Sequence, residues 1–319
     1  MKVERGHNMS TLFPRIGNRL FRLLYMPICR AYARYVLGDK PADLMMRILC
    51  SVQFYRVNGI WPHFINPQLF SEKLWHRMLY NRNPLLTLIS DKLNVRDYVS
   101  QKIGKDYLIP IIWHGENPES IPFDDLPDKF VIKTNHGCSY NIIVNNKGML
   151  DQNKTKKQLK KWLEVNYCTD KWMGIEWGYK HVKPTILIET MIEENGNTPV
   201  DYKFYCFSGA VECVTVHLDR FVEHKTKTFD RNFSHHEFRY NLPQWRGTCE
   251  RPLIYDRMVN VAEILSRDFQ FLRVDLYCIG NKIYFSELTP YPGGISLQFL
   301  PLEQDRLFGQ RWQCRGDKI

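Results

Sequence analysis

Two acidic residues near the C-terminal end of the chain suggest chemistry most directly, because the strands that carry them bring their carboxylates together. Asp275 and Glu287 each lie in a segment of alternating side-chain character, and each segment predicts a β-strand. A two-residue turn at 280–281 would put the carboxylates on opposite faces of the hairpin, whereas a three-residue loop at 280–282 sets them directly opposite each other. We predict the second register.

This pair of carboxylates predicts a site for a cation. Like charges at opposed positions destabilise a sheet unless something neutralises them, and two hard oxygen ligands suit Mg²⁺ that carries the phosphates of a nucleotide. Arg273 shares the predicted face of Asp275. The predicted face of the second strand consists of Ile283, Phe285, Glu287 and Thr289. The alternative is an ordinary hairpin with two solvated carboxylates.

A lysine inside an apolar strand points to the phosphates themselves. Lys133 ends the apolar run of a strand expected at 129–134, and a loop that contains Gly137 follows directly. An ammonium beside a loop with aligned backbone N–H groups can hold phosphates, and a lysine is seldom buried without a partner. Lys92 supplies a second ammonium, which we expect on a helix covering 85–103. The alternative for Lys133 is an outward-facing strand lysine.

The rest of the pattern predicts an α+β chain without internal repeats. Helical spacing marks the region up to about residue 57, then 70–80 with Ser71 as the N-cap, 154–167 and 255–267. Further strands are expected at 142–144, 185–192, 202–207 and 210–218. Hairpins of this kind, with helices packed beside them, indicate antiparallel sheets.

Composition restricts the class of protein. With 319 residues, of which 44% are hydrophobic, the chain can build one multi-lobed enzyme or two modest domains. No stretch approaches the roughly 18 uncharged apolar residues of a membrane span, and charges stand where a signal peptide would be apolar, so we expect a cytoplasmic protein. Nine cysteines without a CxxC pair favour a reducing compartment and argue against zinc.

The net charge of +10 calls for an anionic partner. Among residues 1–35, arginines alternate with large apolar residues, as in a basic amphipathic helix that lies peripherally on an anionic membrane. These arginines are Arg5, Arg15, Arg19, Arg22, Arg30 and Arg34. The alternative is a helix packed on its own protein with a charged outer face. Because no nucleic-acid-binding motif is present, we expect no nucleic-acid partner.

Five phrases occur in a fixed order along the chain. They are Phe70-Ser-Glu-Lys-Leu74, Asp91-Lys92 to Val95-Arg96-Asp-Tyr98, Lys133-Thr-Asn-His-Gly137, Asp201-Tyr-Lys-Phe-Tyr-Cys-Phe-Ser-Gly209 and Val274-Asp-Leu-Tyr277. With them the chain resembles the TupA-like ATP-grasp family of bacterial teichuronopeptide and capsule-type polysaccharide pathways, over about residues 50 to 305. The resemblance implies an ATP-grasp fold, in which two antiparallel-sheet lobes enclose a nucleotide beside a helical N-terminal region. It divides the chain into a basic, mainly helical arm at 1–50, a helical region at 51–125, a small lobe with phosphate loop and hinge at 126–192, and a large lobe with the metal site at 193–319.

The resemblance also implies ATP and Mg²⁺ as cofactors and a role for each matching residue. The implied ATP-binding residues are Lys92, Lys133, Gly137, Glu189, Thr190, Met191, Ile192, Asp201 and Lys203, with 189–192 as the adenine hinge. The implied metal ligands are Asp275, Glu287 and, weakly, Thr289. The implied catalytic residues are Lys133, Arg220 and Arg273. Two positions depart from the pattern: Thr289 stands where many ATP-grasp enzymes have asparagine, and Ser139 stands where a second glycine is expected.

The activity implied is that of an ATP-dependent carboxylate-amine ligase. A substrate carboxylate takes the γ-phosphoryl group of ATP, and an amine then displaces phosphate from the acyl-phosphate to form an amide. We expect small-molecule or glycan substrates from a surface-polysaccharide pathway. A metal-dependent glycosyltransferase, a sugar kinase and a non-catalytic nucleotide-binding accessory protein stay open as alternatives, although the chain lacks the Asp-x-Asp motif of the first.

Overall fold

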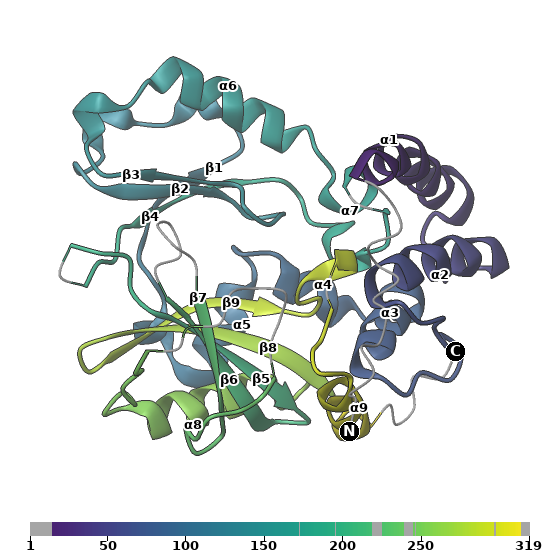
Figure 1. Ribbon diagram of the computed structural model, residues 1–319. Coiled ribbons are helices and arrows are strands. Elements are labelled where there is room, and N and C mark those ends of the chain that lie inside the picture. Colours follow the sequence, from purple (N-terminus) through teal and green to yellow (C-terminus); the bar gives the residue numbers. More distant parts are fainter. Residues whose placement is uncertain are drawn as a thin grey trace.

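The computed structural model describes residues 15–171, 173–194, 196–218, 225–238, 245, 247–296 and 298–313. Two antiparallel sheets lie one above the other in Figure 1, and helices of the N-terminal region lie beside them. The predicted α+β class with two antiparallel-sheet lobes and a helical N-terminal region is therefore confirmed.

The small sheet has the strand order β1-β4-β2-β3. Its strands are β1 (Ile111–Gly115), β2 (Phe130–Thr134), β3 (Asn141–Val144) and β4 (Ile186–Thr190). Helix α6 (Gln152–Leu163) covers its outer face, where Leu159 packs in one hydrophobic cluster with Phe130, Ile132 and Ile188 (Figure 1). The sequence did not indicate β1, which pairs with β4 although it precedes residue 126. The division of the chain into four parts stays a prediction.

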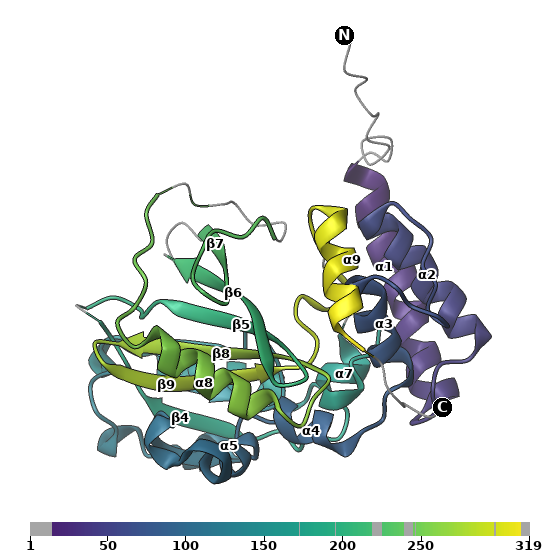
Figure 2. The same cartoon turned by 90° about the horizontal axis from the view of Figure 1, so that it is seen from below.

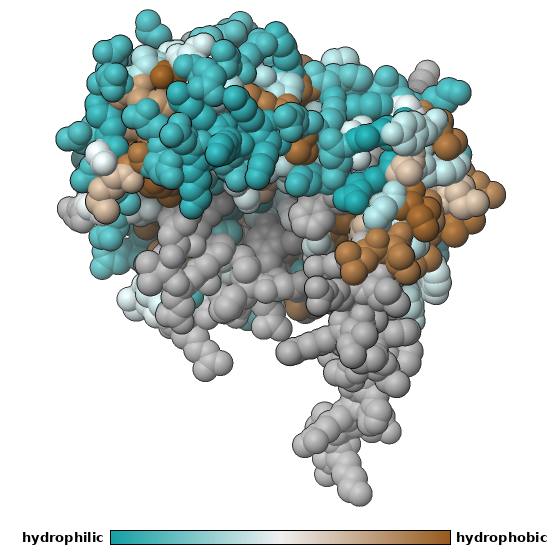
Figure 3. Space-filling model, turned by 90° about the horizontal axis from the view of Figure 1, so that it is seen from above, coloured by the Kyte–Doolittle hydropathy of each residue, from teal (hydrophilic) through white to brown (hydrophobic). Residues whose placement is uncertain are grey.

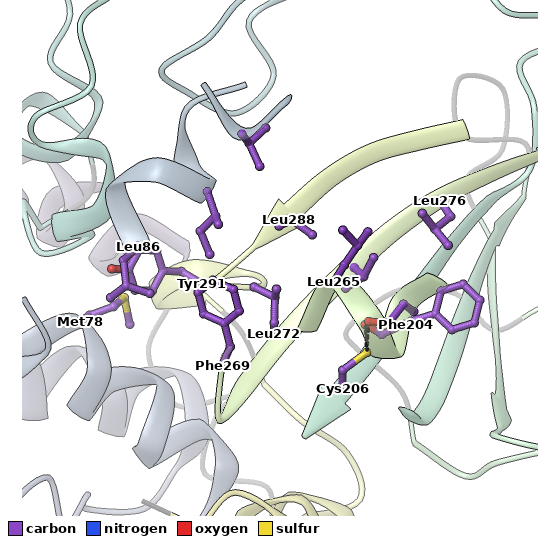
Figure 4. Packing of buried hydrophobic residues seen from close by; sticks show 14 of the residues in the cluster. Met78, Leu86, Phe204, Cys206, Leu265, Phe269, Leu272, Leu276, Leu288 and Tyr291 are labelled. Carbon is purple, nitrogen blue, oxygen red and sulfur yellow. Dashed lines mark hydrogen bonds between the residues drawn. The ribbon is translucent and has the colours of Figure 1, made fainter. Parts of the chain in front are cut away.

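The large sheet has the strand order β7-β6-β5-β8-β9. Its strands are β5 (Asp201–Phe207), β6 (Ala210–Leu218), β7 (Lys225–Asp230), β8 (Phe271–Ile279) and β9 (Lys282–Thr289). Helix α8 (Tyr255–Ser266) lies across one face (Figure 2). Figure 4 shows Phe204, Leu272 and Leu276 of this face beside Leu265 of the helix, all fully buried.

The opposite face of the large sheet is divided between charged and aromatic side chains. Alternate residues of β5 and β8 share this face, because side chains alternate along a strand. One end carries Asp201, Lys203, Arg273 and Asp275, and the other carries Tyr205, Phe207 and Phe271. Helix α9 (Leu302–Arg311) and helix α3 (Phe70–Tyr80) cover the aromatic end through Phe308 and Phe70. The charged end is thereby left facing the small sheet.

The remaining helices are α1 (Arg15–Tyr32), its π-helical continuation η2 (Ala33–Leu37), α2 (Leu44–Asn58), α4 (Pro84–Ser90), α5 (Val95–Ile103) and α7 (Tyr167–Asp170). Helices α1, α2 and α7 lie beside the two sheets (Figure 1), whereas α4 packs against β9 and α5 packs against α8. Among the described residues, no helix is long and apolar enough to span a membrane.

Two details of the predicted helices were wrong. Ser71 is not the N-cap of α3: its backbone N–H and hydroxyl both donate to the carboxylate of Asp305 on α9, at 2.8 and 2.6 Å, and Glu72 accepts from the backbone N–H groups before the helix. The helix expected at 85–103 is two helices, because the carboxylate of Asp91 accepts from the backbone of Leu93 and Asn94 and so favours a turn there.

Candidate active site

The hairpin β8–β9 places Asp275 directly opposite Glu287, as predicted, but not by the predicted route. Its turn has two residues, since Ile279 pairs with Lys282. The register then shifts between Asp275 and Leu276, so that Ser286 is an extra residue on β9. This β-bulge, and not a longer loop, moves Glu287 onto the face of Asp275.

The bulge also corrects the predicted face of β9. Ile283 and Phe285 point into the hydrophobic core and are 2% and 5% exposed. Glu287 and Thr289, beyond the bulge, lie on the opposite face beside Arg273. The expectation that all four share one face was therefore wrong, because the alternation of side chains changes phase at the extra residue.

Asp275 is fully buried between two cations. Its Oδ2 atom lies 2.5 Å from Lys203 Nζ, and the guanidinium of Arg273 donates to both of its carboxylate oxygens at 2.7 Å. Lys203 also lies 2.7 Å from Asp201 on its own strand. Burial by itself lowers the pKa of Lys203, but the carboxylates of Asp201 and Asp275 outweigh it, and the pKa is raised.

Arg273 contacts all three residues for which a metal-binding role was implied. Its Nη2 atom lies 2.7 Å from Asp275 Oδ2, 3.0 Å from Glu287 Oε1 and 3.1 Å from Thr289 Oγ1. The Thr289 hydroxyl in turn donates to Glu287 at 3.0 Å. The cation that opposed carboxylates require is thus supplied by the protein's own guanidinium. We call Asp201, Lys203, Arg273, Asp275, Glu287 and Thr289 the charged cluster.

The small sheet contributes a second ion pair facing the charged cluster. Lys133 Nζ on β2 lies 2.5 Å from Glu189 Oε2 on β4, so Lys133 is not an isolated outward-facing lysine. Burial lowers the pKa of Lys133, but the charge of Glu189, with a contribution from Glu287, outweighs it, and the pKa is raised. Arg96 of α5, to which the sequence assigned no role, lies 3.7 Å from the other oxygen of Glu189.

Lys92 lies in the turn between α4 and α5, not on a helix as expected. Its ammonium donates to the backbone carbonyl of Gly137, and among the described residues it contacts no carboxylate. Burial lowers its pKa, and the charge of Glu287 acts in the opposite direction. Because Glu287 influences both Lys92 and Lys133, residues from both sheets meet in one electrostatic environment.

Asn135 fixes the loop after β2, although no role was predicted for it. Its Nδ2 atom donates to Asp91 Oδ1 and to the carbonyl of Lys183, both at 2.9 Å, and its Oδ1 accepts from the N–H of Thr185 at 2.7 Å. The residue is 1% exposed. It therefore ties the loop both to the turn that carries Lys92 and to the start of β4.

Two positions of this loop favour glycine, each for a different reason. A Cβ atom at Gly137 would lie 2.6 Å from the ring of Tyr167, so only glycine fits without displacing that ring. Ser139 has φ +63°, the left-handed conformation in which the expected glycine would be unstrained. The departure at Ser139 thus carries a conformational cost.

The implied hinge residues lie at the end of β4 and after it. The N–H of Thr190 donates to the carbonyl of Pro110 at 3.0 Å, and Met191 and Ile192 follow the strand half-buried. Arg220 lies outside the described residues. The structure therefore brings together the implied lysines and carboxylates from both sheets, while the binding roles of all these residues stay predictions.

Glu176, which the sequence did not indicate, is a buried carboxyl beside Gly294. It is 7% exposed, and Oε1 lies so close to Gly294 that a Cβ there would be 2.5 Å away. Gly294 lies five residues after Thr289. Within the described part of the chain, no side chain or N–H donates to this carboxyl. Burial accordingly raises the pKa of Glu176 to about 7.

This raised pKa predicts a specific dependence of stability on pH. The folded protein keeps the Glu176 proton to about pH 7, whereas the unfolded chain releases it near its ordinary pKa, so stability falls between about pH 4.5 and 7. Glu176→Gln should remove this decline, on the order of 3 kcal/mol, which urea unfolding of both proteins at pH 5 and pH 8 would measure. Burial also raises the pKa of Asp305 to about 6. Its contribution to the stability therefore falls over the same range in both proteins and cancels when they are compared. Parallel pH profiles of variant and wild type would contradict the prediction.

Two antiparallel sheets that face each other across lysines and carboxylates define the ATP-grasp fold. The chain belongs to the TupA-like ATP-grasp family, whose model matches residues 72–313. The family assignment from the five sequence phrases is therefore confirmed, and with it the ATP-grasp fold. No curated protein matches the chain.

Solved structures with a similar fold are ATP-grasp enzymes at low identity. A D-alanine–D-alanine ligase from Bacillus anthracis complexed with ATP is 14% identical, with a TM-score of 0.39 and coverage of 66% of this chain and 56% of that one. The ATP-grasp ligase PsnB, complexed with a phosphomimetic precursor variant, Mg and ADP, is 11% identical, with a TM-score of 0.36 and coverage of 78% and 61%. An N5-carboxyaminoimidazole synthase from Aspergillus clavatus is 11% identical, with a TM-score of 0.37 and coverage of 69% and 50%. The chain thus spans less than two thirds of the length of each.

Proposed function

We propose that this protein is an ATP-dependent ligase that forms an amide bond through an acyl-phosphate intermediate. The observation that carries the proposal is that the charge of Glu287, which pairs with Asp275 across the hairpin, acts on both Lys92 and Lys133, in a chain of the ATP-grasp family. The pathway context of the family supports a carboxylate and an amine or amino acid from bacterial surface-polysaccharide biosynthesis of the capsule or teichuronopeptide type.

The site would hold Mg-ATP by complementary charge. Lys92 has no carboxylate partner among the described residues, so its ammonium is suited to a phosphate, with Lys133 and the loop through Gly137 beside it. The hinge at 189–192 would hold the adenine, while Asp201 and Lys203 flank the nucleotide. Asp275, Glu287 and, weakly, Thr289 are hard oxygen donors of the kind that hold Mg²⁺ together with phosphate oxygens. The ion would offset phosphate charge there and would compete with Arg273, whose guanidinium donates to all three residues in this structure.

The residues present then suit two successive transfers. A carboxylate oxygen of the first substrate attacks the γ-phosphorus of ATP, and ADP leaves. The amine nitrogen of the second substrate attacks the acyl carbon and loses a proton, and phosphate leaves with that carboxylate oxygen. Arg273 would offset the charge of the acyl-phosphate and of the tetrahedral species. Closure of the loop through Gly137 would exclude water, which would otherwise hydrolyse the activated acyl group.

An oxygen-transfer experiment tests this reaction. ADP release is first screened with Mg-ATP across uronic acids, amino acids and their nucleotide-linked forms, singly and in carboxylate–amine pairs. For an active pair, a carboxylate labelled with ¹⁸O should deliver one labelled oxygen to the released phosphate. The Lys133→Ala variant should release no ADP above background, because the ammonium beside the phosphates is lost.

The same screen distinguishes the alternatives. A sugar kinase would release ADP with an alcohol acceptor alone and form no free phosphate. A glycosyltransferase would consume a nucleotide-sugar without ATP. Phosphate free of label in the presence of an active carboxylate–amine pair would refute the acyl-phosphate route, and ATP affinity without any turnover would indicate an accessory protein.

A further inference from the structure

Exposed large apolar side chains are concentrated on the first two helices. Sixteen large hydrophobic side chains are exposed among the described residues, and ten of them lie between residues 23 and 65. Eight belong to the stretch from α1 to α2 and are 50–77% exposed, and we call them the α1–α2 surface. They are Leu23, Leu24, Ile28, Tyr35, Val36, Leu44, Met45 and Ile48. Figure 3 shows the brown, hydrophobic patch at the end of the molecule where these helices lie.

The helices present this surface because each has a separate inner face. On α1 and η2, Cys29 and Ala33 are buried, whereas Leu24 and Ile28 form a stripe on another side of the helix. The two helices form one unit, because Tyr25 Oη donates to the carbonyl of Leu49 and Tyr32 Oη donates to Asp43 Oδ2 at 2.5 Å. The packing of these helices on the core therefore does not require the exposed apolar side chains. The helix therefore packs on its own protein, as in the alternative left open by the sequence, but the outward side chains described from Leu23 onward are mostly apolar.

Basic residues accompany the apolar ones. Residues 23–61, whose side chains the structure describes, contain five lysines and arginines against two aspartates and glutamates, and one of the five, Arg34, pairs with Asp170. Lys40 is exposed beside the surface, and Arg47 lies half-buried within α2. The carboxylate of Asp39 is already occupied by Lys180 and His181, each at 2.8 Å, and that of Asp43 accepts from the N–H of Met46. The local charge is thus positive where the apolar side chains are exposed.

We propose that the α1–α2 surface docks on an anionic membrane, with α1 and α2 lying in the plane of the interface. A helix with an apolar face and basic flanks buries the former among acyl chains and sets the latter against anionic headgroups. The exposed rings of Tyr35 and Trp61, 77% and 60% exposed, are of the kind that favours the headgroup region. A second copy of this chain fits less well, because a two-fold contact would set each basic surface against itself.

This proposal is independent of the ligase reaction and is tested without substrates. The full chain is sedimented with vesicles of mixed phosphatidylcholine and phosphatidylglycerol, and with vesicles of phosphatidylcholine alone. Wild-type protein should pellet with the mixed vesicles only, and added salt should weaken the binding because it screens the charges. No pelleting with the mixed vesicles would overturn the proposal.

Two sets of substitutions locate the contact. The variant with Leu24→Gln, Ile28→Gln, Met45→Gln and Ile48→Gln should lose about tenfold or more of its partition into the mixed vesicles. Lys40→Gln with Arg47→Gln should lose a smaller part, together with some of the salt dependence. Met149→Gln with Leu253→Gln removes two side chains that are 84% and 93% exposed elsewhere, and should pellet like wild type.

A folding control and two further results complete the test of membrane docking. Thermal unfolding of each variant confirms that these exposed substitutions leave the fold intact. Equal pelleting of the four-residue variant and wild type would overturn the proposal. So would a dimer in sedimentation velocity that the same variant abolishes, because the surface would then be an interface between two copies.

Discussion

Lys203→Met lowers the free energy of unfolding by about 3–5 kcal/mol, the largest stability effect that we expect from a single substitution. Lys203 is 4% exposed, and its ammonium lies between Asp201 and Asp275, which are 2% and 0% exposed. Methionine has a similar volume but no charge, so the two buried carboxylates lose a shared cation at short distance. A whole domain is stable by only about 5–15 kcal/mol, so this loss is a large fraction of the total.

Urea unfolding measures this effect, and an exposed ion pair supplies the control. Lys129 lies 2.8 Å from Glu193 on the surface, with half of the lysine side chain exposed. Lys129→Met should therefore cost less than about 1 kcal/mol, because solvent screens such a pair. Equal unfolding midpoints for Lys203→Met and Lys129→Met would show that the buried ammonium does not stabilise the charged cluster.

Glu287→Gln should reduce kcat/KM for Mg-ATP by about a hundredfold or more while leaving the fold intact. The side chain is 38% exposed, and an amide of the same shape still accepts from Arg273 at the position now 3.0 Å away. Stability is thus retained, whereas one of the two negative charges that would hold Mg²⁺ is lost. The loss should appear at saturating ATP and should diminish in part as the Mg²⁺ concentration rises.

The matched control for this variant is Glu303→Gln in the first turn of α9, an exposed position away from the charged cluster. It should retain wild-type turnover and thermal stability. Full activity of Glu287→Gln would remove this residue from the proposed metal site, and joint loss of folding and activity would show that its role is structural.

The strands of the site were largely predictable because their side-chain patterns are strong. The segments expected at 202–207 and 210–218 agree with β5 and β6 to within one residue, and the pairing of Asp275 with Glu287 is as predicted. The bulge was not predicted, although the chain carries a signal for it. Phe285 and Leu288 are both apolar but three positions apart, and strict alternation would have put one of them on the charged face.

Other features depend on contacts between distant segments and leave little trace in a local pattern. The break between α4 and α5 follows from Asp91, which accepts from both the next turn and Asn135, 44 residues later. Arg273 was expected on the face of Asp275, but its place between Asp275, Glu287 and Thr289 emerges only when three strand positions are known together. The burial of Glu176 likewise depends on Gly294, more than a hundred residues away.

In many hairpins the turn also determines which face each side chain occupies, but in β8–β9 the extra residue on β9 contributes to that choice. Because Ser286 supplies a one-residue offset, a two-residue tip at 280–281 is compatible with Asp275 and Glu287 on the same side of the sheet. The tip itself does not need a third residue to align them. Between 285 and 289, by contrast, a single insertion or deletion would turn the acidic side chain into the apolar interior.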